Sequence, residues 1–325
     1  MIVRSSVRLV VIASAIAVWA APASAQEGRF ERTLSVSGPV SLEVRTASGG
    51  ITVRRGGTGV VQVTGTIRAR RRWLEFGDVE GYIRHVEAQP PITQNGNRIR
   101  LALPEDERIR RRLSISYDVL VPGDTEVEAH SGSGSITVDG LQRNARTHTG
   151  SGSVRVSNVD GSVRADTGSG SVTLEAIGQA AEASTGSGSI EARGVGTDLD
   201  ASTGSGRIVA TLQGKGTVRA HTGSGSVDIS GVNGAADVNS SSGGIRVDGD
   251  PSGDWKMHAA SGSIVIDVPD EAAFRIDARS SSGSITVDHP LTVQGTVGRK
   301  TLQGTVRGGG SLLALSTASG SITVR

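Results

Sequence analysis

Hydrophobic and polar residues alternate with a period of two along most of this chain, and the alternation restarts about every 18 residues. Each restart carries a glycine-rich hexad, such as Thr-Gly-Ser-Gly-Ser-Val at residues 149–154, whose second glycine we call the anchor of its repeat. From Gly134 to Gly283 successive anchors are 18, 18, 18, 18, 19, 18, 19 and 21 residues apart, by subtraction of their positions. A fixed period of this size is typical of a repeat architecture. The anchors are Gly49, Gly134, Gly152, Gly170, Gly188, Gly206, Gly225, Gly243, Gly262, Gly283 and Gly320.

Four positions of each repeat are apolar, namely those seven and five residues before the anchor and those two and four residues after it. In the repeat of Gly170 they are Val163, Ala165, Val172 and Leu174. The residues between them are mostly charged or hydroxylated. Alternation at period two is typical of a half-buried strand, whereas an amphipathic helix needs a period of 3.6. Each repeat therefore predicts two short strands.

The hexad predicts a turn between these strands, because glycine reaches backbone angles that other residues avoid. Strands of successive repeats can then pair in parallel. The sequence predicts an all-β fold, a parallel β-solenoid of about 18-residue two-strand coils, whose coils are stabilised mainly by their neighbours.

Residues 1–25 have the composition of a secretory signal peptide. Arg4 and Arg8 precede an apolar run at 9–21, and Ala23-Ser24-Ala25 offers a small-residue cleavage site. The run is short for a membrane span. We therefore expect an exported protein, in the periplasm, on the outer surface or secreted, with no transmembrane span after cleavage.

Charge and cysteine content narrow the classes of partner. The formal charge of +2 falls to 0 when Arg4 and Arg8 are removed, so net charge gives no support for nucleic-acid binding. The chain has no cysteine, which excludes disulfides and thiolate metal sites.

After the signal peptide we divide the chain into two continuous parts. Residues 26–128 form an N-terminal β region that holds one coil and an insert with one short helix at 73–88, which Pro90-Pro91 ends. We expect this helix to cover an open end or a flank of the solenoid. Residues 129–325 hold the solenoid repeats, with an irregular segment at 288–312.

The segment 321–325 follows the anchor Gly320 and reads as the last strand of the stack. If the segment 288–312 leaves it open, its unpaired backbone groups could add a strand from another molecule. The sequence therefore predicts weak self-association through this last coil.

Two columns of polar residues are candidates for a binding site. Thr149, Thr167, Thr185, Thr203 and Thr222 fall in phase with buried Ala and Val, so we expect inward hydroxyls that are bonded locally rather than an ice-binding face.

His130, His148 and Asp166 each lie four residues before an anchor, so they should stack at about 4.8 Å on the outer face. Two imidazoles and a carboxylate could hold a divalent metal. The same column continues with other polar residues, and we therefore expect a solvated surface, no metal site and no cofactor. The continuing residues are Ser184, Ser202, His221, Asn239 and His258.

Two arginine runs, at 70–72 and at 108–112, could form a basic patch for an acidic glycan or a lipid headgroup. Carboxylates lie close to both runs, at Glu75, Asp78 and 105–107, and favour an ordinary solvated surface.

The order of these parts resembles the putative-adhesin family of bacterial β-solenoids, also called domain of unknown function 4097. The resemblance rests on a coil at 42–53, an insert that ends near Pro90-Pro91, and Val121-Pro122-Gly123 leading into Ser-Gly-Ser repeats. The tail adds a glycine-rich stretch at 304–310 and a last Ser319-Gly320-Ser321. The family implies an envelope or surface protein and no catalytic residues.

These observations together indicate a non-enzymatic envelope or surface protein, an adhesin-like binding or structural module. Its partners would be a surface glycan, a lipid headgroup or an envelope protein, and not nucleic acid. The alternative is a polysaccharide-active β-helix enzyme with a site near residues 70–112 or 288–312. No Walker, dinucleotide-binding or Gly-x-Ser-x-Gly motif is present.

Overall fold

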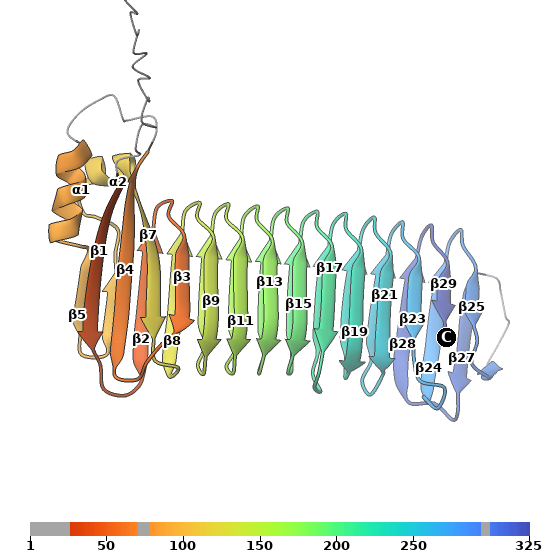
Figure 1. Ribbon diagram of the computed structural model, residues 1–325. Coiled ribbons are helices and arrows are strands. Elements are labelled where there is room, and N and C mark those ends of the chain that lie inside the picture. Colours follow the sequence, from red (N-terminus) through yellow and green to blue (C-terminus); the bar gives the residue numbers. More distant parts are fainter. Residues whose placement is uncertain (1–26, 71–78, 294–299) are drawn as a thin grey trace, which may run out of the picture.

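The computed structural model describes residues 27–70, 79–293 and 300–325. They form an elongated stack of coils in which two long sheets face each other (Figure 1). The predicted parallel β-solenoid is confirmed. The predicted signal peptide at 1–25 lies outside the described residues.

One strand of each coil belongs to sheet A and the other to sheet B. Sheet A has fourteen strands, in the spatial order β1 (Glu27–Ser35), β4 (Val60–Ala69), β7 (Leu113–Val121), β3 (Ile51–Arg55), β9 (Ile136–Leu141), β11 (Val154–Val159), β13 (Val172–Ile177), β15 (Ile190–Val195), β17 (Ile208–Leu212), β19 (Val227–Asn233), β21 (Ile245–Asp250), β23 (Ile264–Asp267), β29 (Ile322–Val324) and β25 (Ile285–Val287). Sheet B has fifteen, in the order β26 (Leu291–Val293), β27 (Thr301–Val306), β24 (Phe274–Ser280), β28 (Ser311–Thr317), β22 (Trp255–Ala259), β20 (Ala236–Ser240), β18 (Val218–Thr222), β16 (Leu199–Thr203), β14 (Ala181–Thr185), β12 (Val163–Thr167), β10 (Ala145–Thr149), β8 (Thr125–Ser131), β2 (Val40–Thr46), β6 (Arg98–Leu101) and β5 (Ile92–Asn95).

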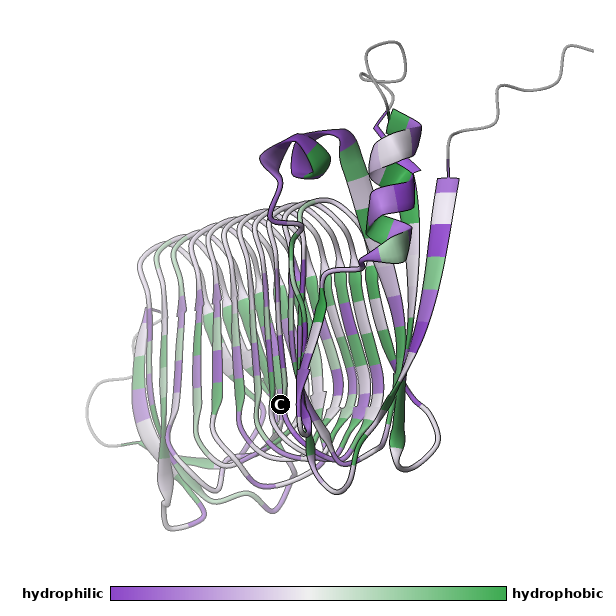
Figure 2. Cartoon of the chain, turned by 90° about the vertical axis from the view of Figure 1, so that its left-hand side faces the viewer, coloured by the Kyte–Doolittle hydropathy of each residue, from purple (hydrophilic) through white to green (hydrophobic). Residues whose placement is uncertain are grey.

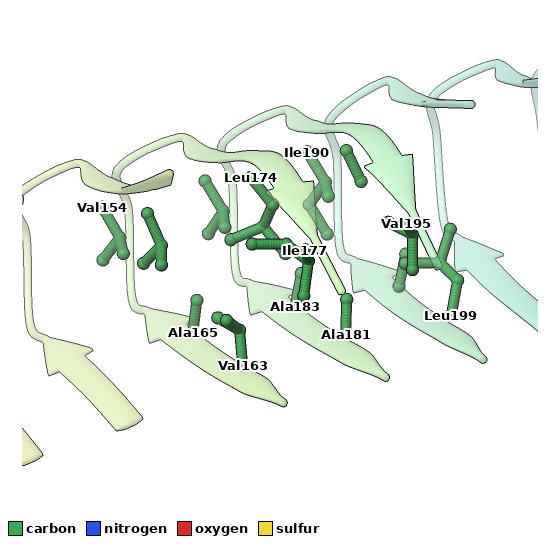
Figure 3. Packing of buried hydrophobic residues seen from close by; sticks show 14 of the residues in the cluster. Val154, Val163, Ala165, Leu174, Ile177, Ala181, Ala183, Ile190, Val195 and Leu199 are labelled. Atoms are coloured by element: carbon green, nitrogen blue, oxygen red, sulfur yellow. The ribbon is translucent and has the colours of Figure 1, made fainter. Parts of the chain in front are cut away.

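The core is a thin layer between the two sheets (Figure 3). Parallel pairing keeps each apolar column in register, so that Val163 lies beside Ala181 and Val172 beside Ile190. All four are at most 3% exposed, which confirms the predicted strand phase. Hydrophobic and hydrophilic residues alternate along the strands (Figure 2), and buried residues alternate with more exposed ones, as in β12 and β13.

The hexads of successive coils stack on one another so closely that a side chain does not fit at the anchor. A Cβ atom built on Gly170 would lie 2.0 Å from the carbonyl oxygen of Gly152, and one on Gly152 would lie 2.1 Å from that of Gly134. Real Cβ contacts are essentially never shorter than 3.0 Å. The anchors are therefore glycine because the backbone of the neighbouring coil occupies the space.

A buried hydroxyl three residues before the anchor ties each hexad to the preceding one. Thr167 Oγ1 donates to the carbonyl of Gly152 at 2.8 Å and accepts from the N–H of Gly170 at 3.2 Å. The same pair of bonds recurs with the other threonines of this column, which confirms that their hydroxyls point inward and are bonded locally. The coil of Gly262 has Ala259 at this position and lacks the hydroxyl.

At the N-terminal end, the coil formed by β2 and β3 comes first in the sequence but is not the outermost coil of the stack. Its strand β3 pairs with β7 on one side and β9 on the other, while β2 pairs with β6 and β8. The segment between β3 and β8 therefore folds back over the outer side of the coil. Strands β4 and β1 extend sheet A beyond it in antiparallel pairing.

The helix expected in the insert is present as α1 (Val79–Ala88), which packs on β1 and β4 with Val79, Ile83 and Val86 buried. It covers a flank of sheet A, as expected (Figure 1). The expected range began at residue 73, but residues 71–78 lie outside the described part of the chain. Gly28 of β1 lets the helix approach, because a Cβ there would lie 2.3 Å from Ile83 Cγ2.

The prediction of a single helix was wrong. A second one, α2 (Glu107–Arg112), precedes β7, and Asp106 caps it by accepting a hydrogen bond from the N–H of Arg108 at 2.8 Å. Six residues with one buried side chain, Ile109, are too few for a helical period to be visible in the sequence.

The predicted open last coil is also wrong. Strand β29 pairs with β23 on one side and with β25 on the other, and β28 lies between β22 and β24. The coil of Gly320 is therefore inserted between those of Gly262 and Gly283, so β29 has no free edge for strand addition.

Residues 294–299 of the segment 288–312, expected to be irregular, lie outside the described part of the chain. Strand β27 of this segment pairs antiparallel with β24 and with β26, and this extends sheet B past the last coil. Sheet A ends at β25. In the described part of the chain, the strand that pairs with β25 is β29.

The first prediction concerns the anchors. Gly170→Ala should lower the free energy of unfolding by about 2 kcal/mol or more, because the new methyl group forces two coils apart along both sheets. Gly57→Ala is the matched control, since a Cβ at Gly57 meets nothing within 4 Å. Urea unfolding followed by circular dichroism measures both. Equal stability of the two variants would contradict the close stacking.

The second prediction concerns the hydroxyl column. Thr167→Val keeps the shape but leaves two buried backbone groups without their partner, so it should cost about 1–3 kcal/mol. Ala259→Ser should instead stabilise the protein by about 0.5–1.5 kcal/mol, because it supplies the hydroxyl that this coil lacks. Thermal unfolding of both variants is the measurement. A destabilising Ala259→Ser would show that the bond geometry does not carry over to that coil.

Candidate functional site

The outer face of sheet B carries two columns of polar side chains that run the length of the solenoid. The charged column lies six residues before each anchor and the histidine column lies four residues before it. In spatial order the charged column is Arg100, Glu43, Glu128, Arg146, Arg164, Glu182, Asp200, Arg219, Asp237, Lys256, Ala314 and Asp277. The histidine column is Arg45, His130, His148, Asp166, Ser184, Ser202, His221, Asn239, His258, Ser316 and Arg279.

The structure brings the candidate metal residues side by side. His148 pairs with His130 on one side and with Asp166 on the other, and the two imidazole rings are 6.1 Å apart. Two of the three side chains have other partners, however. His130 Nε2 donates to Glu128 Oε1 at 2.7 Å, and Asp166 accepts from Arg164 at 3.1 Å and from Ser184 Oγ at 2.7 Å.

The contact between His130 and Glu128 also changes the acidity of the carboxyl group. The hydrogen bond from the imidazole lowers the pKa of Glu128 below its ordinary value. The same carboxylate lies 3.9 Å from Arg45. Glu128 therefore stays ionised in moderately acidic solution.

Within residues 27–70, 79–293 and 300–325, no three His, Asp or Glu side chains are placed to hold a metal ion together. The expectation that His130, His148 and Asp166 bind no metal stays a prediction.

Ion pairs along the charged column join neighbouring coils. Arg164 contacts Glu182 of the next coil at 2.9 Å, and Arg146 lies 4.0 Å from Glu126 of the preceding one. The Arg164 side chain is 52% exposed and that of Glu182 46%, so such pairs contribute little stability in water. They hold the charged groups in place while leaving them accessible to a ligand.

Three shallow depressions lie on this face. The central one has a volume of about 450 Å³ and is bordered by Arg146, Arg164, Arg219, Glu182 and Asp200. A second, of about 370 Å³, lies near Glu43, and a third, of about 380 Å³, lies where Ala314 replaces a long charged side chain. Long and short side chains in the outward columns thus shape the face into hollows with both signs of charge.

The helical cap holds a separate cleft of about 500 Å³. Its walls are α1, the Pro90-Pro91 segment and α2, and its lining is mostly apolar, including Leu103. Leu103 is 37% exposed. His85, Glu105 and Asp106 also line this cleft, which lies within the range 70–112 considered for an enzyme site, although its wall α2 was not expected.

The arginine runs behave largely as an ordinary surface where the structure describes them. Arg108 pairs with Asp106 at 3.0 Å and Arg111 with Glu107 at 2.6 Å. Arg70 donates to Ser48 Oγ at 2.7 Å. Arg71 and Arg72 lie outside the described residues.

Among the described residues, no helix is long and apolar enough to cross a membrane.

The chain belongs to the Toastrack DUF4097 family, whose model matches residues 41–325. This confirms the family resemblance noted in the sequence. Comparison with functionally curated proteins finds no match.

Two solved structures resemble the chain along most of its length. One is a putative adhesin of Bacteroides fragilis, with 11% identity and a TM-score of 0.35, in which 91% of this chain matches 97% of the other. The other is a putative cell adhesion protein of Clostridium sporogenes, with 8% identity, a TM-score of 0.22 and coverage of 91% and 98%. Neither likeness is close enough to bear on function.

The third prediction is that zinc does not bind usefully at His130, His148 and Asp166, since Glu128, Arg164 and Ser184 compete for two of the three ligands. Calorimetric titration of the purified protein with zinc should show no submicromolar site. Submicromolar binding that disappears in His148→Ala would contradict this and define a metal site.

Proposed function

We propose that this chain is an exported, non-enzymatic module of the cell envelope or surface, which binds its partner through the outer face of a stiff solenoid. One observation carries the proposal: the polar side chains of sheet B stand in register over eleven successive coils and form hollows lined by charge. Such a face suits a ligand that extends along the rod, and a surface glycan fits best.

The stiffness of the stack supports a role in presentation. Each inner strand is hydrogen-bonded on both sides, and each hexad is tied to its neighbour by a buried hydroxyl. A solenoid of this kind has no internal hinge between coils that share one continuous core. Its two outer faces can therefore display side chains at a fixed spacing.

Two carboxylates of the helical cap, Asp106 and Glu107, already have structural partners, which supports the proposal that the chain is not an enzyme. Asp106 is held as the cap of α2 and by Arg108, whose side-chain hydrogen bond lowers the pKa of the Asp106 carboxyl. A general acid needs a raised pKa instead. Glu107 is paired with Arg111 across one helical turn.

The cleft beside α2 keeps a polysaccharide-active enzyme as the second candidate, because His85, Glu105 and Asp106 line it together. Release of reducing ends from envelope polysaccharides tests this candidate. Activity that disappears in Glu105→Gln would establish the enzyme and overturn the proposed binding module.

Export is supported by the composition of residues 1–25 alone. Cell fractionation with an antibody to the solenoid should find the protein in the periplasm, on the surface or in the medium. A protein confined to the cytosol would contradict the proposal.

The fourth prediction tests the binding face. On a glycan array, the triple variant Arg146→Glu, Arg164→Glu, Arg219→Glu should lose about tenfold or more in affinity, because it reverses the cations around the central hollow. The matched control reverses three arginines on the outer face of sheet A, by Arg155→Glu, Arg193→Glu and Arg246→Glu, and should bind as the unchanged protein does. Equal loss in both variants, or in neither, would show that sheet B is not the binding face.

A further inference from the structure

Four of the six histidines of the chain lie in one outward column of sheet B, the histidine column defined above. They are His130, His148, His221 and His258. His130 is partly exposed and the other three are exposed.

Fixed charges within the charged and histidine columns balance, while Arg98, Glu126 and Asp198 line the hollows beside them. The charged and histidine columns together hold seven permanently cationic side chains, namely Arg45, Arg100, Arg146, Arg164, Arg219, Lys256 and Arg279. They also hold seven carboxylates, namely Glu43, Glu128, Asp166, Glu182, Asp200, Asp237 and Asp277. With neutral imidazoles the two columns have no net charge.

The neighbours of each histidine differ between the two ends of the column. His130 faces Arg45, His148 and its own strand's Glu128, while His148 faces His130, Asp166 and Arg146. Arg164 also bonds Asp166, so two imidazoles here share two carboxylates with three arginines.

Further along, uncharged residues flank the histidines. His221 lies between Ser202 and Asn239, and Arg219 precedes it on its own strand. The diagonal neighbours of His221 are Asp200 and Asp237.

His258 lies between Asn239 and Ser316, with Nδ1 2.9 Å from the Ser316 hydroxyl. Lys256 precedes His258 on its own strand, and Asp237 and Ala314 are the diagonal neighbours.

Imidazole is the side chain that ordinarily changes charge between pH 5 and 8. Because the fixed charges of the two columns cancel, protonation of the histidines gives these columns a net positive charge in this range. Protonation of all four adds four positive charges along a line of seven coil steps, about 34 Å at 4.8 Å per step.

We propose that the outer face of sheet B binds an acidic polysaccharide along the axis of the rod, and that protonation of the histidine column switches this binding on as the pH falls from about 7.5 to 5.5. This rests on the proposed function and names its ligand class and its regulation. A linear array of cations matches a linear polyanion, since each coil can meet successive charged groups of one chain.

Other polyanions fit this face less well. Proteins that bind single-stranded nucleic acid commonly stack its bases on Trp, Tyr or Phe rings, and neither column contains one of these three residue types. A lipid surface is favoured by exposed apolar side chains, and Leu103, the large exposed hydrophobic residue of the described part, lies in the cap between β6 and α2.

The test uses polygalacturonate as the probe and the purified full chain, at constant ionic strength. Binding should be at least about tenfold tighter at pH 5.5 than at pH 7.5. The quadruple variant His130→Gln, His148→Gln, His221→Gln, His258→Gln should lose this pH dependence. The matched control places four glutamines on the outer face of sheet A, by Thr52→Gln, Thr137→Gln, Thr173→Gln and Thr211→Gln, and should retain it.

Two double variants keep the test informative if the quadruple variant folds poorly. His130→Gln with His148→Gln, and His221→Gln with His258→Gln, should each remove part of the pH dependence. Unchanged pH dependence in both double variants would overturn the proposal.

Additional arms separate this inference from the proposed function. Equal binding of polygalacturonate at both pH values would leave a glycan-binding module and overturn the histidine switch. Tighter, histidine-dependent binding to phosphatidylglycerol vesicles than to polygalacturonate would replace the polysaccharide with a membrane. Binding to no glycan, vesicle or envelope extract would contradict the proposed function itself.

Discussion

The close approach of one hexad to the next is the constraint on which the rest of the structure depends. At the anchor, the backbone of one coil occupies the place where the next coil would carry a Cβ atom, as at Gly152 and Gly170. Only glycine permits this, and the neighbouring hydroxyl of Thr167 fixes the distance by bonding to both hexads. The coil spacing set at this turn keeps both sheets in parallel register and places the outward columns of sheet B in line. The alignment of the proposed binding face therefore follows from the turn rather than from any individual surface residue.

The strand phase and the fold class could be predicted from the sequence because burial on one side of a strand imposes a period of two on many repeats at once. Val163 and Val172 lie in the core, and Thr167 points inward, as their positions in the period indicate. The order of coils at the two ends could not be predicted in this way. Because the hexads are nearly identical, the strand at 322–324 fits equally well beside several others. Distance along the sequence does not predict its neighbours, because the chain turns back and inserts this coil between two earlier ones. Helix α2 was missed because six residues show no period.

The candidate site was only partly visible in the sequence. Stacking of His130, His148 and Asp166 followed from the period, and so did the charged column that contains Arg164. The hollows did not, because they arise from differences in side-chain length between neighbouring coils, such as Ala314 beside Lys256. The cap cleft also depends on α2. Polar repeats of this kind predict which residues share a face, whereas the shape and the charge balance of that face require the spatial order of the coils.

The alignment of the outer face of sheet B depends most directly on the spatial order of the coils. Disulfide trapping measures this order. The chain has no cysteine, so introduced pairs report without interference. Ser321 lies between Ser263 and Ser284, with its N–H 3.3 Å from Ser263 Oγ and its hydroxyl 3.4 Å from that of Ser284. The pair Ser263→Cys and Ser321→Cys should oxidise readily to an intramolecular disulfide, detected by mass spectrometry of the peptides. Ser263→Cys with Ser284→Cys should not, because two coil steps, about 9.6 Å, exceed the reach of about 7 Å of a disulfide. An efficient bridge between positions 263 and 284, with none between 263 and 321, would contradict the inserted coil and the alignment of the face built upon it.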